Sequence, residues 1–325
     1  MPHQTSSKAG FGLAIFSAAT FSTSGALAKS LIDAGWSPAA AVTARVSIAA
    51  LILAIPAAVL MRGRWHLVRR DSLVIASYGL VAVAGCQLFY FNAVQHLSVG
   101  VALMLEYLGT ILVVGWMWAR HGQRPRRLTL LGAAAALTGL VLILGVFGNS
   151  HLDLAGVLWA LGAAVGLAVF FVLASHSRED LPPMALATGG MGVGAITLLA
   201  LGGVGVLPMH ATFGVVTFAG HHVSWLIPVG CLSLVAGVIA YLAGISAARV
   251  LGPKLSSFTS LTEVIFAVVV AWLLLSQLPT GIQLAGGVLI VAGIVLVRID
   301  ELRPPRVPEL APGEQPPATA ELAAR

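Results

Sequence analysis

Three ionisable side chains fall deep inside apolar stretches of the sequence: Arg45, Glu106 and Glu263. A charge at the centre of a membrane helix costs roughly 2.5 to 3.5 kcal/mol on insertion scales, so such residues are expected to face a cavity or a partner. A carboxylate in that position can hold an amine of a bound molecule or exchange a proton. The alternative for both glutamates is structural, a buried pair or a hydrogen bond between helices.

The positions of these charges along their apolar stretches suggest which of them can meet. Glu106 and Arg45 each lie about 8 residues, or ~12 Å, from the same expected membrane surface, so they could pair. Glu263 lies about 8 residues from the opposite surface. It is close to the inverted counterpart of Glu106, although the best alignment sets it opposite Gly109. Arg45 is interpreted as a structural residue that orients a carboxylate, with contact to the carboxylate of a bound molecule as the alternative.

Polar and aromatic side chains accompany these charges. Gln87, Tyr90 and Tyr107 are the best candidates to line a cavity. Thr20 and Ser24 lie four residues apart and share one helix face. Serine and threonine in membrane helices usually serve helix packing, so packing is the alternative for these two. The candidate substrate-binding or coupling site therefore comprises Glu106, Arg45, Glu263, Gln87, Tyr90, Tyr107, Thr20 and Ser24.

The composition indicates a membrane-spanning framework for these residues. The chain has 325 residues, 58% hydrophobic and 9% charged, with a mean hydropathy of +0.96, whereas a soluble chain is about 25% charged. Since about 20 apolar residues cross ~30 Å of hydrocarbon, we predict an all-α membrane protein. Its ten transmembrane helices are expected at about 9–29, 38–60, 72–95, 99–119, 128–147, 153–175, 183–206, 223–247, 255–275 and 280–298.

Lysine and arginine concentrate in every second connection, and cytoplasmic loops hold the excess of these residues. With both termini in the cytoplasm, 16 of the 18 basic residues fall on the cytoplasmic side. The chain is therefore expected to be a multi-pass protein of the plasma membrane with a short cytoplasmic N-terminus at 1–8. Residues 300–325 have no apolar period and are predicted to be a disordered cytoplasmic tail.

The last five apolar stretches repeat the first five. The segment LLGAAAALTGLVL at 130–142 precedes LAGGVLIVAGIVL at 284–296 by 154 residues, so Gly132 and Gly139 align with Gly286 and Gly293. Because five is odd, the second copy must enter the membrane upside down relative to the first. The predicted domains are thus two inverted five-helix repeats at 9–147 and 152–299. Inverted repeats around a central site are a recurring construction of secondary transporters.

Other function classes lack their sequence signals. The chain has no P-loop, which disfavours ATP-driven transport, and no H-E-x-x-H or G-x-S-x-G, which disfavours an intramembrane protease or lipid hydrolase. Cys86 and Cys231 are interpreted as small buried residues rather than metal ligands or a disulfide. Without a basic face on a soluble domain, no nucleic-acid partner is expected. We expect no enzymatic activity, no metal and no cofactor.

The sequence resembles the drug/metabolite transporter superfamily, specifically its ten-helix EamA-type members with two EamA repeats. The resemblance covers residues 10–299. In the first half it rests on WSP at 36–38, Arg45, FNAVQHLS at 91–98, LEYLG at 105–109 and the glycines within 132–139. In the second half it rests on 241–252, SLTE at 260–263 and 283–293. The sequence departs from the family at Thr110 and Val264, where the family often has proline in the fourth and ninth helices.

The LEYLG arrangement is similar to the branch that includes threonine and homoserine exporters. The resemblance implies a secondary transporter that exports amino acids or related small metabolites by alternating access, with protons as a candidate coupling ion. Its partners would be a small-molecule substrate and the lipid bilayer. The alternatives are a multidrug-type exporter, or a receptor or scaffold of the same fold that binds a small ligand without transport. The sequence leaves the oligomeric state open.

Overall fold

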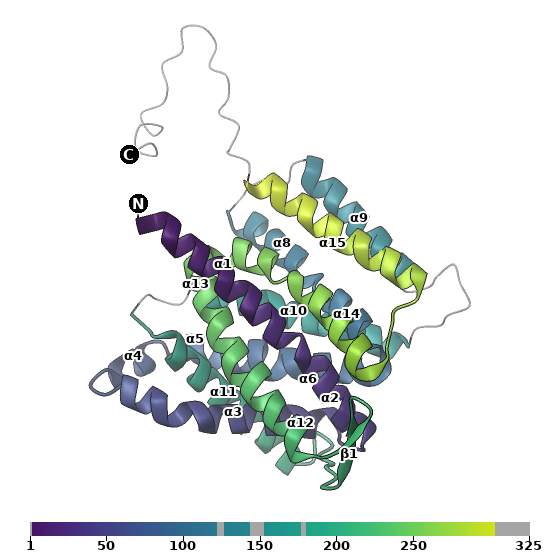
Figure 1. Cartoon of the computed structure of the whole chain (residues 1–325). Helices are drawn as coiled ribbons and strands as arrows, with labels where there is room; N and C mark the ends of the chain where they lie inside the picture. Colours follow the sequence, from purple (N-terminus) through teal and green to yellow (C-terminus); the bar gives the residue numbers. More distant parts are fainter. Residues whose placement is uncertain (1, 122–126, 144–152, 177–179, 303–325) are drawn as a thin grey trace, which may run out of the picture.

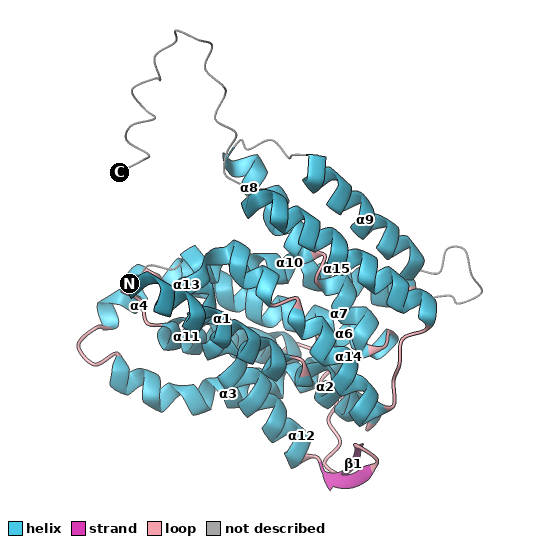
Figure 2. Cartoon of the chain, turned by 45° about the horizontal axis from the view of Figure 1, so that its top comes forward, coloured by secondary structure: helices cyan, strands magenta, loops and turns pink. Residues whose placement is uncertain are grey.

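The computed structural model describes residues 2–121, 127–143, 153–176 and 180–302, which form a bundle of helices with one short β-hairpin (Figures 1 and 2). The first half contains α1 (Pro2–Phe21), α2 (Thr23–Asp33), α3 (Pro38–Leu60), α4 (Trp65–Arg70), α5 (Ser72–Ser77), the π-helix η1 (Tyr78–Gly85), α6 (Cys86–His96), α7 (Val99–Glu106), α8 (Gly109–His121) and α9 (Arg127–Ile143). The second half contains α10 (Leu154–His176), α11 (Pro183–Gly203), β1 (Val215–Phe218), β2 (His221–Ser224), α12 (Leu226–Cys231), the π-helix η2 (Leu232–Ile239), α13 (Ala240–Thr259), α14 (Thr262–Leu275) and α15 (Gly281–Leu302).

Seven segments of the described residues are long and apolar enough to cross a membrane. They are Lys8–Asp33, Pro38–Leu60, Ser72–His96, Leu154–Ala174, Pro183–Gly203, Leu226–Gly252 and Leu255–Leu275. Three shorter apolar helices, Val99–Val113, Leu130–Leu142 and Gly281–Gly293, fall on the fourth, fifth and tenth predicted spans. The helical membrane fold is confirmed, while the full count of ten spans stays a prediction.

The structure differs from the prediction in the connection that follows α11. We predicted helices only, but β1 and β2 pair antiparallel from Val215 opposite Ser224 to Phe218 opposite His221. Ala219 and Gly220 turn the chain between them with positive φ angles of 52° and 74°, as a two-residue hairpin turn requires. The connection between α11 and α12 is long enough to fold back on itself as a hairpin. A search for apolar periodicity does not detect such a pairing.

Smaller differences concern segment ends and one cysteine. Helix α1 begins at Pro2, inside the segment predicted as the 1–8 terminus, and α15 continues to Leu302, inside the predicted tail. The rest of that tail, 303–325, lies outside the described residues. Cys86 is buried as predicted, whereas Cys231 is exposed on the bundle surface. The prediction is wrong for Cys231 because a uniformly apolar helix does not reveal from its sequence which residues face outward.

Several irregular features occur in both halves at the same spacing. The π-helices η1 and η2 each contain 8 residues and begin at Tyr78 and Leu232, 154 residues apart. This is the spacing at which the glycines of α9 and α15 align. A π-turn is rare and costs hydrogen-bond geometry, so its repetition at the same register shows that the two halves share local backbone geometry as well as hydropathy.

Helices α9 and α15 lie side by side at one edge of the bundle (Figures 1 and 2). A Cβ atom built on Gly139 would overlap the carbonyl oxygen of Gly286, and one built on Gly293 would overlap the carbonyl oxygen of Gly132. Each repeat thus contributes one glycine and one carbonyl to a reciprocal backbone contact. Small residues allow this close approach between membrane helices.

The connection between α2 and α3 is tied to the connection that precedes the hairpin. Ser37 Oγ donates to the carbonyl oxygen of Pro208 at 2.6 Å, Trp36 Nε1 donates to that of Thr212 at 2.8 Å, and Thr212 Oγ1 donates to that of Ala34 at 2.6 Å. The rings of Trp36, Phe213 and Trp225 pack together beside these bonds. We call this end of the bundle the hairpin face.

Ser37→Ala is expected to lower the free energy of unfolding by about 1 kcal/mol, because Ser37 is also the N-cap of α3 and accepts from the backbone N–H of Ala40. The measurement is the thermal unfolding midpoint in detergent. Ser37→Thr retains the hydroxyl and serves as the matched control. Equal midpoints for the alanine variant and the wild type would show that neither the cap nor the cross-connection bond contributes.

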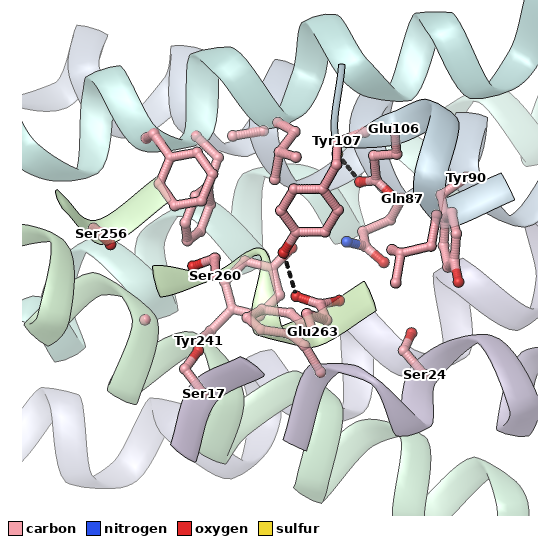
Figure 3. Close-up of a pocket in the computed structure, with 18 of the residues that line it drawn as sticks. Ser17, Ser24, Gln87, Tyr90, Glu106, Tyr107, Tyr241, Ser256, Ser260 and Glu263 are labelled. Atoms are coloured by element: carbon pink, nitrogen blue, oxygen red, sulfur yellow. Dashed lines mark hydrogen bonds between the residues drawn. The ribbon is translucent and has the colours of Figure 1, made fainter. Parts of the chain in front are cut away.

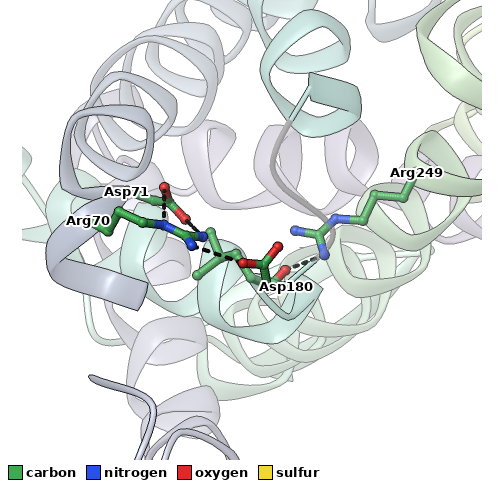
Figure 4. Close-up of polar contacts among 5 residues, drawn as sticks. Arg70, Asp71, Asp180 and Arg249 are labelled. Carbon is green, nitrogen blue, oxygen red and sulfur yellow. Dashed lines mark hydrogen bonds and ion pairs between the residues drawn. The ribbon is translucent and has the colours of Figure 1, made fainter. Parts of the chain in front are cut away.

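At the opposite end, the α4 face, a polar cluster joins the two halves (Figure 4). Arg70 forms ion pairs with Asp71 at 2.8 Å and with Asp180 at 2.9 Å. Arg249 of α13 donates to the carbonyl oxygen of Leu181. On the hairpin face, the first connection of the first half therefore meets the second connection of the second half. On the α4 face, the second connection of the first half meets the first connection of the second half. Inverted repeats produce this exchange.

Candidate functional site

Breaks in two helices position the two glutamates. Helix α7 ends at Glu106 and α8 begins at Gly109, while α13 ends at Thr259 and α14 begins at Thr262, with Glu263 in its first turn. At each break the backbone tightens to bonds between residues three apart. The N–H of Thr110 bonds the carbonyl of Tyr107, and the N–H of Glu263 bonds the carbonyl of Ser260. The breaks are thus short 3₁₀ turns.

Neither break uses the proline that the resemblance would place there. Instead, Thr110 Oγ1 donates to the carbonyl oxygen of Tyr107, and Thr262 Oγ1 donates to that of Thr259, each at 2.8 Å. The carbonyl of Tyr107 thus accepts from both the N–H and the hydroxyl of Thr110. The carbonyl of Thr259 receives the Thr262 hydroxyl while the N–H of Glu263 bonds Ser260, and polar side chains that satisfy such carbonyls allow a helix to break at membrane depth. Each break therefore has a threonine, Thr110 or Thr262. The family often has proline at the positions of Thr110 and Val264.

Both glutamates line a cavity at the centre of the bundle (Figure 3). Helices of both halves supply its wall. The lining residues are Ala14, Ser17, Phe21, Ser24, Ala82, Cys86, Gln87, Tyr90, Leu103, Glu106, Tyr107, Leu167, Phe170, Phe171, Tyr241, Gly244, Ala247, Ser256, Ser260 and Glu263.

Hydrogen bonds hold the two carboxylates across the cavity. Tyr107 Oη donates to Glu263 Oε2 at 2.8 Å, so a residue of the first break orients the glutamate of the second (Figure 3). Cys86 Sγ donates to Glu106 Oε1 at 3.4 Å, and Glu106 is 5% exposed. One oxygen of each carboxylate thus has a protein partner in these bonds, and the two carboxylates share one cavity.

Arg45 lies behind the wall of the cavity. Its guanidinium donates to Ser24 Oγ at 2.9 Å, to Gln87 Oε1, and to the carbonyl oxygen of Ala236 at 2.7 Å. The structure therefore places Arg45 with these three oxygens and not in an ion pair with Glu106. Equal depth in the membrane does not fix the direction in which a side chain leaves its helix, which is why depth alone suggested the pair.

The other candidates divide into two groups. Ser24, Gln87, Tyr90 and Tyr107 line the cavity. Thr20 is not among the lining residues, and its hydroxyl bonds the carbonyl oxygens of Phe16 and Ser17 in its own helix. Thr20 thus lies in the last turn of α1, two residues before Ser22, the residue that separates α1 from α2.

Sequence reasoning missed part of the cavity wall. Tyr241, Ser256 and Ser260 come from the second half, and Phe170 and Phe171 from α10. Tyr241 had a signal, since at the 154-residue spacing of the two π-helices it aligns with Gln87, so carrying the candidate residues through the repeat would have found it. The two phenylalanines had none, because an aromatic residue in an apolar helix does not stand out from its neighbours.

The cavity extends further toward the α4 face than toward the hairpin face. Ser256 lies one residue inside the span Leu255–Leu275, whereas on the other side the lining ends at Leu103, four residues from Val99. The lining therefore reaches closer to the ends of the spans on the α4 face than to their ends on the hairpin face.

Comparison with known proteins agrees with the repeat organisation. The chain matches the EamA-like transporter family over residues 8–145 and again over 154–299. An uncharacterized transporter of Archaeoglobus fulgidus is 25% identical over 227 residues, covering 70% of this chain and 76% of that protein. The threonine/homoserine exporter RhtA of Salmonella typhimurium is 28% identical over 180 residues, covering 55% of this chain and 57% of that exporter.

The fold also occurs among solved structures. One crystal structure superposes with a TM-score of 0.59, covering 91% of this chain and 97% of that chain, at 21% sequence identity. At that identity the likeness shows a shared fold and nothing about cargo.

Proposed function

Because the chain belongs to the EamA-like transporter family, we propose that it is a secondary transporter that exports amino acids or related small metabolites by alternating access, with protons as the coupling ion. The observation that carries this proposal is the central cavity, whose wall comes from both repeats and contains one glutamate beside a helix break of each repeat. A site between two repeats can be exposed to either side of the membrane as the repeats rock against each other.

The amino-acid part of the proposal has two supports. One relative that the chain matches over 180 residues is named a threonine/homoserine exporter. In addition, Glu106 and Glu263 present carboxylate oxygens to the cavity, and an ammonium group forms strong charge-assisted hydrogen bonds with carboxylates. Ser256, Ser260 and Tyr90 offer hydroxyls for other polar groups of the cargo.

The same two carboxylates support the proton-coupling part of the proposal. A cargo ammonium and a proton both neutralise a glutamate, so a carboxylate that releases one can accept the other. Exchange of a cargo ammonium for a proton at Glu106 would link outward movement of cargo to inward movement of protons. The proposal includes plasma-membrane location with both termini in the cytoplasm, supported by the distribution of basic residues.

The test is counterflow into proteoliposomes that contain the purified full-length chain. Vesicles preloaded with unlabelled threonine, homoserine or a wider metabolite and drug panel are diluted into labelled compound, with and without an imposed proton gradient. Saturable counterflow that the gradient accelerates in one direction is expected. Saturable binding without counterflow would instead favour a receptor, and chemical conversion of the compound would favour an enzyme.

A further inference from the structure

We propose that the cavity selects its cargo by an amino group and an apolar or aromatic body, and that it disfavours a free carboxylate. Amines and carboxyl-blocked amino acids, such as amides, are then preferred to zwitterionic amino acids. This inference rests on the proposed function and narrows its substrate class.

The charge of the cavity wall is the first argument. Among the described lining residues there are two carboxylates, Glu106 and Glu263, and no lysine, arginine or histidine. A cargo carboxylate would leave water to sit beside two groups of the same charge. Burying a charge without a partner is costly, and like charges that share a site repel each other.

Arg45 does not supply the missing partner. It is 1% exposed and does not line the cavity. Its donors are directed to Ser24, Gln87 and Ala236, and the rings of Phe21, Phe91 and Tyr241 surround its guanidinium with their centroids 5.8 to 5.9 Å from Cζ. A cargo carboxylate could reach Arg45 only by displacing this shell of hydrogen bonds and aromatic faces.

At the helix breaks, four backbone N–H groups are already occupied. The N-terminus of a half-helix often binds a substrate carboxylate through free backbone N–H groups. Here the N–H groups of Thr110, Ile111, Glu263 and Val264 already bond carbonyls three residues earlier. Glu263 also stands in the first turn of α14, where its own carboxylate occupies the favourable position for a negative charge.

The aromatic part of the wall suits the rest of such a cargo. Tyr241 stacks edge-on against Phe21 at 5.0 Å and Phe170 at 5.8 Å between ring centroids, and Phe170 contacts Phe171 at 5.2 Å. These four rings form a continuous surface opposite polar groups. Aromatic rings bury apolar groups, so a cargo with an aromatic or branched tail can place that tail against these rings and its ammonium group beside Glu106 or Glu263.

A matched ligand series tests this inference with the full-length chain. The compounds are phenylalanine, phenylalaninamide, phenethylamine and 3-phenylpropionate, at a pH of about 7 where most of the amino groups are still protonated. Binding is measured by thermal shift in detergent, and transport by competition with counterflow of labelled phenethylamine. We expect the amide and the amine to compete at least about tenfold better than phenylalanine, a difference of about 1.4 kcal/mol, and 3-phenylpropionate not to compete.

Two variants identify the groups responsible. Glu263→Gln is expected to weaken the binding of the amine and of the amide at least about tenfold. The difference between their affinities and that of phenylalanine should therefore become smaller. Asp33→Asn removes a carboxylate outside the cavity, paired with Lys29 at 2.8 Å, and is expected to match the wild type.

The outcomes separate this inference from the proposed function. Phenylalanine that competes as well as its amide would overturn the inference and leave amino-acid transport standing. Binding of the amine and the amide without counterflow would support the selectivity of the cavity and overturn transport. Absence of both binding and counterflow for all four compounds would overturn the inference, while counterflow of threonine or homoserine in the wider panel would still support transport.

Discussion

Glu106→Gln is expected to slow counterflow of the cargo about 30-fold or more, with little change in the amount of folded protein. A hydrogen bond to a charged group is worth about 1.5 to 3 kcal/mol, and the loss of 2 kcal/mol corresponds to about 30-fold. Glutamine keeps the side-chain length and an oxygen that accepts from Cys86 Sγ. The packing around position 106 should therefore survive while the negative charge is removed.

The measurement is the initial rate of counterflow, with size-exclusion elution and thermal midpoint recorded on the same preparations. Acceleration by an imposed proton gradient should also disappear in Glu106→Gln, because the amide does not exchange a proton in this range. A rate equal to that of the wild type would show that Glu106 is structural, the alternative that its sequence setting left open.

Gly109→Ala is expected to destabilise the protein by about 1 to 3 kcal/mol, the usual cost of an added methylene in a packed interior. A Cβ atom at this position would overlap the carbonyl oxygen of Ala164 and lie 3.0 Å from its carbonyl carbon. These are backbone atoms of α10, so no side chain can rotate away. Helices α8 and α10 would have to separate next to the break that positions Glu106.

Gly115→Ala is the matched control, because it lies in the same helix and a Cβ atom there would meet nothing within 4 Å. It should unfold at the wild-type temperature or slightly above, since alanine is the better helix former. The comparison uses thermal unfolding in one detergent. Equal midpoints for the two variants would contradict the close approach of α8 and α10.

The sequence carries enough information to predict the membrane class, the repeat and much of the cavity wall. Glu106 and Glu263 can be found because a charge contrasts with an apolar helix. Polar side-chain atoms contrast in the same way, which identifies Gln87, Tyr90 and Tyr107. The role of Arg45 is less accessible. Its depth could be counted along the chain, but its direction depends on the rotation of its helix, which packing against neighbouring helices decides.

The helix breaks show a second limit. Proline is the recognisable cause of a broken helix, yet the chain breaks at Tyr107 and Leu108, and again at Ser260 and Leu261, without one. Hydrogen bonds from Thr110 and Thr262 stabilise these turns. Threonine is common within membrane helices for other reasons, so its presence did not predict a break.

The contact between α9 and α15 has a consequence for how this sequence can change over time. Gly139 and Gly293 each press against a carbonyl that the other repeat supplies, at Gly286 and Gly132. A larger residue at either glycine cannot be accommodated within its own half, because the obstructing atom belongs to the other half and is backbone. Each repeat therefore restricts the residues that the other repeat can carry at these positions, because replacing either glycine would force α9 and α15 apart.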